Sequence, residues 1–147
     1  MYTALKHAHS GWAYIVLIVL IIATANAFIG FVRKREYRPT DFRLGLFTLI
    51  ATHIQFLIAL VLWIISPLGL ALWQNNSMKD LMGSSALRLY AVEHPITMII
   101  VVALVTIGYS KHKKKLTSTP KLKTLTIFFS ISLILMLSRI PWASWIG

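Results

Sequence analysis

Four long apolar runs with almost no charged residues decide which solvent this chain folds in. A helix that crosses the hydrocarbon core of a bilayer needs about 20 apolar residues, and the first three runs are long enough. The fourth completes its length with flanking Lys and Trp residues. Only 13% of the residues are charged, against about 25% in soluble domains, so we predict an integral membrane protein and exclude soluble-enzyme, collagen-like and disordered chains. The runs are Gly11–Val32, Leu44–Ser66, about Ala91–Ser110, and Leu125–Ser138 extended to Trp145.

The positions of the basic residues predict the orientation of the helices. Eleven of the fifteen Lys and Arg residues lie in segments 33–43 and 111–123, which join the first helix to the second and the third to the fourth. Basic loops stay on the cytoplasmic side of a membrane, so we expect both termini outside, in the periplasm. Anionic lipid headgroups then explain the net charge of +11 without nucleic acid. The first helix imitates a secretory signal, but cleavage there would leave the first basic segment outside, so we interpret it as a retained helix.

Short linkers predict one domain over residues 1–147, an all-α, up-down-up-down bundle of four transmembrane helices. The residues after Pro39 predict an N-cap at Thr40 or Asp41 for the second helix. Ser84 and Ser85 are candidate caps for the third helix, and we expect Trp73 to anchor an outer segment in the membrane interface. The predicted helices cover about 8–32, 43–66, 86–110 and 122–142.

Three histidines within or directly beside the apolar runs are the candidate functional residues, because ionisable groups are costly in lipid and face the protein interior. Helical spacing puts His9 and His94 on the small-residue packing faces of the first and third helices, whereas His53 lies off the corresponding face of the second. The first and third helices are diagonal in such a bundle, so we expect His9 and His94 to face each other. A rise of ~1.5 Å per residue offsets them by roughly 10 Å along the membrane normal, which a tilt of the first helix has to remove.

Two neutral imidazoles facing each other across an apolar slot are what a b-type haem iron needs. We therefore predict His9 and His94 as axial ligands, with His53 as the alternative ligand, and Arg139 or Arg88 as partners of the haem propionates. Arg139 shares the estimated depth of His94, so we also expect it to contact Glu93 or an anionic cofactor group. A purely structural role for the histidines, or a role in quinone, metal or proton chemistry, stays open, and His112 is interpreted as a surface residue.

The residues that are absent narrow the chemistry further. The chain has no cysteine, which excludes disulfides, iron–sulfur clusters, thiol catalysis and covalent haem attachment. It also lacks a Ser-His-Asp set, an HExxH motif and a Gly-rich nucleotide fingerprint. Hydrolytic and nucleotide-driven functions therefore have no support, and whether the chain is an enzyme stays open.

Four short motifs carry a resemblance to known proteins. They are His7-Ala8-His9-Ser10-Gly11, Thr52-His53-Ile54-Gln55, Glu93-His94-Pro95 and Ser138-Arg139-Ile140-Pro141-Trp142. Together they resemble a group of small four-helix membrane proteins from Bacteroidetes labelled cytochrome b, and are loosely similar to the SirB-type family. The resemblance covers nearly the whole chain, singles out His9, His53 and His94, and implies a haem-linked, respiratory-type role.

Two functional hypotheses follow. The first is a small b-type haem protein of the bacterial inner membrane, with an electron-transfer or quinone-linked role beside larger membrane-protein subunits. The alternative is a non-catalytic accessory subunit that packs on a larger complex and whose histidines are structural. Either protein has membrane lipids as its surroundings.

Overall fold

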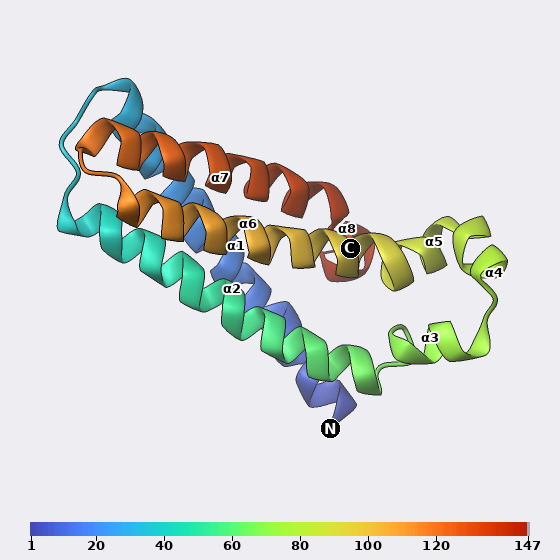
Figure 1. The fold of residues 1–147 in the computed structure, drawn as a ribbon. Helices are drawn as coiled ribbons and strands as arrows, with labels where there is room; N and C mark the ends of the chain where they lie inside the picture. Colours follow the sequence, from blue (N-terminus) through green and yellow to red (C-terminus); the bar gives the residue numbers. More distant parts are fainter. Residues whose placement is uncertain (147) are drawn as a thin grey trace.

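The computed structural model describes residues 1–146, which are mostly helical and contain no strand (Figure 1). Four stretches built around the long helices are long and apolar enough to cross a membrane. This confirms the all-helical class, and the four long helices have the length and apolar composition that a membrane-spanning protein requires. The long helices are α1 (Tyr2–Val32), α2 (Pro39–Ile65), α6 (His94–Lys114) and α7 (Ser118–Arg139). The short ones are α3 (Leu70–Asn75), α4 (Met78–Gly83), α5 (Ser85–Arg88), the π-helical turn η1 (Leu89–Glu93) and α8 (Trp142–Trp145).

The packing of the four long helices leaves α1 and α6 on a diagonal. Helix α1 packs against α2 and α7, and α6 packs against the same two helices. The buried core is apolar and draws on all four helices, with Leu20, Ala51, Val105 and Phe129 among its members. Large apolar side chains such as those of Leu57 and Ile134 point outward instead, as lipid-facing positions require.

The bundle is narrow at one end and wide at the other (Figure 1). At the narrow end, which we call the basic end, the helices converge on the linkers 33–38 and 115–117. Close packing there uses glycine, since a Cβ on Gly108 would collide with the Cβ of Phe128. At the other end, which we call the open end, α1 and α2 spread away from α6 and α7, and α3, α4 and α5 form the outer connection.

The helix boundaries differ from the predicted ones at several ends. Helix α2 begins at Pro39 with Arg38 as N-cap, and Asp41 at the third helical position accepts from the Arg38 amide at 2.7 Å. The N-cap predicted at Thr40 or Asp41 was therefore wrong, because Asp41 caps from inside the first turn. Ser84 does cap α5, accepting from the Leu87 amide, as one of the two predicted candidates.

A π-helical turn precedes His94 and has a visible cause. Pro95 follows His94 and has no N–H, so it cannot donate to the carbonyl of Ala91, four residues earlier. The indole of Trp73 takes this place and donates to the Ala91 oxygen at 3.1 Å. Trp73, predicted as an interfacial anchor, therefore uses its N–H inside the protein and ties α3 to η1. Such π-helical turns are common at functional positions.

Candidate cofactor site

His9 and His94 face each other across the diagonal of the bundle. Their ring centroids are 6.3 Å apart, and the ring planes are perpendicular, at 89°. These two side chains were expected from helical spacing to meet, and the structure brings them together. The offset of roughly 10 Å estimated from helix positions does not separate the rings, because α1 runs obliquely to α6 (Figure 1).

Both histidines line a cavity of about 610 Å³ at the open end. This volume lies within the range of about 300–1,000 Å³ that small-molecule and cofactor sites occupy. All four long helices contribute to the walls, which are largely apolar and include Phe56, Trp63, Met98, Met136 and Trp145. The cavity can therefore exclude water from a large apolar ligand.

The end of α7 sets the tautomer of His94. Helix α7 ends at Arg139, whose carbonyl belongs to the last turn and has no partner within the helix. His94 Nδ1 lies 2.9 Å from this oxygen. A carbonyl only accepts, so Nδ1 carries the proton and donates, which leaves the Nε2 lone pair free for a metal ion.

His9 is held differently and carries an unsatisfied atom. Its backbone carbonyl accepts from Gln55 Nε2 at 2.8 Å, which ties α2 to α1 beside the cavity. Its ring Nδ1 is buried and has no hydrogen-bond partner among residues 1–146. Buried polar atoms are almost always paired, so this nitrogen is available to a ligand or a water molecule.

His53 lies outside this site. Its Nε2 is 2.8 Å from Thr106 Oγ1, in a contact between α2 and α6, and it does not line the cavity. The sequence analysis placed His53 on a different face from the packing stripe of its helix, and the structure agrees. Its role as an alternative ligand has no geometric support in the described residues.

The two arginines predicted as propionate partners do not line the cavity. Arg88 pairs with Glu93 at 3.4 Å, and the Arg139 guanidinium donates to the Ser138 carbonyl at 2.8 Å. The predicted contact between Arg139 and Glu93 was therefore wrong, because Arg88 is nearer along the chain and occupies the carboxylate. Arg139 contributes its backbone oxygen to the site, not its charge.

Lys6 is the basic residue that the described part of the chain places in the cavity wall. It lies three residues before His9, and the sequence spacing of Tyr2, Lys6, His9 and Ala13 puts all four on one face of α1. Lys6 was not among the site residues predicted from the sequence. The same spacing rule that located His9 carried the signal for Lys6.

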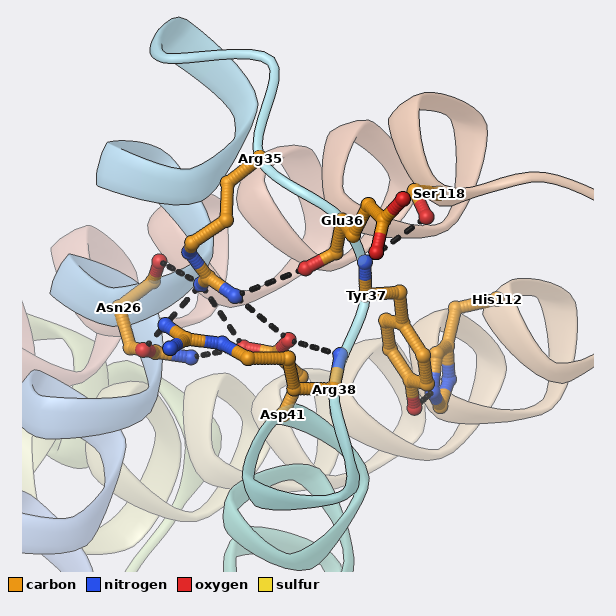
Figure 2. A network of polar contacts seen from close by, with 8 residues as sticks. All are labelled: Asn26, Arg35, Glu36, Tyr37, Arg38, Asp41, His112 and Ser118. Carbon is orange, nitrogen blue, oxygen red and sulfur yellow. Dashed lines mark hydrogen bonds and ion pairs between the residues drawn. The ribbon is translucent and has the colours of Figure 1, made fainter.

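The basic end holds a second group of polar residues, which form hydrogen bonds and an ion pair with one another (Figure 2). Asp41, only 2% exposed, accepts from both terminal nitrogens of Arg35 at 2.9 Å and from the side-chain amide of Asn26. The hydrogen bond to Asp41 raises the pKa of the Arg35 guanidinium. Through its hydrogen bond to Asp41, Asn26 joins α1 to α2.

His112 belongs to this end and corrects a prediction. It was interpreted as a surface residue, yet it is completely buried. Its Nδ1 donates to the Tyr109 carbonyl, so its Nε2 accepts from the Tyr37 hydroxyl at 2.8 Å. The Tyr37 amide in turn donates to Ser118 Oγ at 2.8 Å. Tyr37 reaches His112 from the 33–38 linker and covers it. The periodicity of a single helix does not reveal that a side chain from a distant linker buries one of its residues.

Burial of Tyr37, together with the nearby charge of Asp41, raises the pKa of the Tyr37 hydroxyl to about 12. This group therefore stays protonated and continues to donate to His112 at any physiological pH. The contact works as a permanent structural link between the linker and α6.

Among residues 1–146, no three His, Asp or Glu side chains come together as a metal site. The candidate site thus offers an iron or other metal two imidazoles, His9 and His94. Comparisons with protein-family models, with curated proteins and with solved structures find no match for this chain. The functional conclusion has to come from the site itself.

Proposed function

We propose that this chain is a small b-type haem protein of the bacterial inner membrane, with an electron-transfer or quinone-linked role beside larger subunits. One observation carries the proposal: two half-buried imidazoles from diagonal helices face each other inside one apolar cavity. Two metal–nitrogen bonds of about 2.0 Å and the half-widths of two imidazoles place the ring centroids roughly 6 Å apart. The separation of 6.3 Å agrees with this value.

The remaining residues of the site fit a haem. Arg139 O keeps the Nε2 lone pair of His94 available, and His9 has an unsatisfied ring nitrogen. The apolar walls suit a porphyrin face, and Lys6 suits an anionic edge. When bound, the haem supplies reversible one-electron chemistry at its iron, and burial and ligand identity tune its potential.

The proposed orientation keeps both termini in the periplasm and both basic segments in the cytoplasm, with the helices running up, down, up and down. The basic segments support it, because they flank the short linkers at one end of the bundle. In this orientation the cavity opens toward the periplasmic side. A haem there would lie in the outer half of the membrane.

A reduced-minus-oxidised absorption spectrum of protein purified after haem-replete expression tests the proposal. We expect a b-type band in the wild type, no band in His94→Ala, and a weakened band or a changed spin state in His9→Ala. His53→Ala is the matched control and should retain the band, because His53 bonds Thr106 outside the cavity. A wild type without a band would instead favour the accessory-subunit hypothesis, and a band lost only in His53→Ala would refute the diagonal pair.

A further inference from the structure

One polar atom in the cavity wall has no part in holding a haem. Gln55 Nε2 donates to the His9 carbonyl at 2.8 Å. Because a carbonyl only accepts, the amide nitrogen must face it, and this fixes the orientation of the whole Gln55 amide. Its Oε1 is consequently fixed as well, and it is buried with no donor among residues 1–146.

The nearest polar neighbour on the same helix face cannot satisfy this acceptor. The Thr52 hydroxyl, almost fully buried, already donates to backbone oxygens one turn earlier, at 2.9 Å to Thr48 and 3.0 Å to Leu49. A deprotonated haem propionate, a metal ion or the porphyrin ring does not answer the need either, since Oε1 requires a hydrogen-bond donor. A buried acceptor of this kind is costly unless a ligand donates to it.

The wall beyond Gln55 describes the rest of that ligand. From Gln55 the cavity continues along α2 past Phe56, Ala59, Leu60 and Trp63, all apolar or aromatic. A matching molecule has a flat ring, one hydroxyl donor at its edge and a long apolar body. Those are the properties of a quinol, the reduced form of a lipid-soluble quinone.

We propose that the cavity binds a quinol whose ring hydroxyl donates to Gln55 Oε1, beside the His9–His94 pair. The oxidised quinone carries only acceptors at its ring oxygens, so Gln55 favours the reduced form. The proposal concerns binding alone. That the quinol lies next to a haem rests on the proposed function. The quantity measured is the preference for a ligand with a hydroxyl donor over one without it.

The test compares two ligands and three proteins. Purified protein in detergent, haem-loaded where it shows a b-type band, is titrated under anaerobic conditions with decylubiquinol and with its dimethyl ether, which keeps the ring and the tail but has no donor. We expect the wild type to bind the quinol about tenfold more tightly than the ether, the factor that one hydrogen bond of typical net strength provides. Gln55→Leu should bind both ligands equally. Gln74→Leu, the same substitution at an exposed residue of α3, should behave as the wild type.

The outcomes separate this inference from the proposed function. A b-type band with no preference for the quinol, or with a preference that survives in Gln55→Leu, overturns the inference and leaves the haem. A water molecule on Oε1 would give that same lack of preference. A Gln55-dependent preference in protein without a b-type band overturns the haem proposal and supports the quinol subsite. If Gln55→Leu does not fold, Gln55→Met replaces it, since its unbranched chain fills the same space and lacks the amide.

Discussion

The two ends of the bundle contain similar polar residues and use them in opposite ways. At the basic end, Asp41 and His112 are buried and all their strong hydrogen-bonding groups have protein partners. At the open end, His9 and Gln55 are bonded to each other through one contact, and each retains a buried atom without a protein partner. The buried Asp41 and His112 of the basic end are fully paired, whereas His9 and Gln55 at the open end present unpaired buried atoms beside the cavity.

This contrast has a physical basis. In a membrane there is little hydrophobic force between helices, so polar contacts and close packing hold them together. The basic end supplies both, through the Arg35–Asp41 pair and the close approach at Gly108. Because that end holds the helices in place, the other end can stay apart and keep a cavity of about 610 Å³. Mutations at the two ends should therefore change different properties: haem binding at the open end and the free energy of unfolding at the basic end.

The largest expected effect is the loss of haem from His94→Leu. Removal of this imidazole would take away one of the two proposed haem ligands, so haem per purified protein should fall to background. The free energy of unfolding of the haem-free protein should change little, because the Arg139 carbonyl can return to solvent or lipid headgroups at the end of α7. Extracted haem and a detergent unfolding titration measure the two quantities. Full haem content in His94→Leu would contradict the assigned pair.

The opposite result, a loss of stability with the haem retained, is expected for Asp41→Asn at the basic end. Loss of the carboxylate leaves Arg35 without its bidentate partner, and we expect unfolding to become easier by about 2 kcal/mol. This is below the range for a fully buried pair because the Arg35 side chain is 19% exposed. An unfolding titration gives the change, with Asp80→Asn at an exposed position as control. A b-type band that disappears while the stability stays unchanged would show that the two ends are not separate.

A smaller effect should appear at high pH through Tyr37. Its pKa is raised to about 12 in the folded chain, against about 10 in an unfolded one. The contribution is therefore fully present below pH 10 and is lost as the pH rises toward 12. The wild type should lose stability more steeply over this window than Tyr37→Phe. Equal slopes would show that the Tyr37 hydroxyl is not held as described, and Tyr14→Phe controls for the loss of a phenol elsewhere.

The smallest expected effect belongs to Lys6. If its ammonium meets an anionic edge of the haem, Lys6→Met should weaken haem binding about two- to fivefold at low ionic strength, and less in high salt. Competition for haem with a soluble acceptor protein measures this, with Lys79→Met as control. A larger loss of haem affinity in Arg88→Met or Arg139→Met would instead support these arginines as the propionate partners, as predicted from the sequence.

The fold was largely predictable because the bilayer imposes it. Run length located all four spanning helices, and the face of each helix followed from spacing alone, which is why His9 and His94 were expected to meet. The start of α2 was missed because Asp41 caps from its third position. The π-helical turn also went unpredicted, since it depends on Trp73 replacing the hydrogen bond that Pro95 removes.

The site was less predictable where contacts cross between elements. Helical phase separated His53 from the pair, but the partners of Arg88 and Arg139 depended on side-chain reach and on the path of the chain outside the long helices. His112 was misplaced for the same reason, because the residue that covers it comes from a distant linker. Gln55 was visible on the polar stripe of its helix, yet only the contact with the His9 carbonyl shows that its second atom is free.

The π-helical turn at Leu89–Glu93 has a consequence for how this chain tolerates insertions and deletions. A turn with i→i+5 bonding holds about one residue more than an α-helical turn, so it is equivalent to a one-residue insertion absorbed just outside His94. Deleting one residue there should restore α-helical bonding and rotate everything before it by about 100°, while His94 keeps its register with α7. The outer connection can therefore change in length and orientation without moving His94.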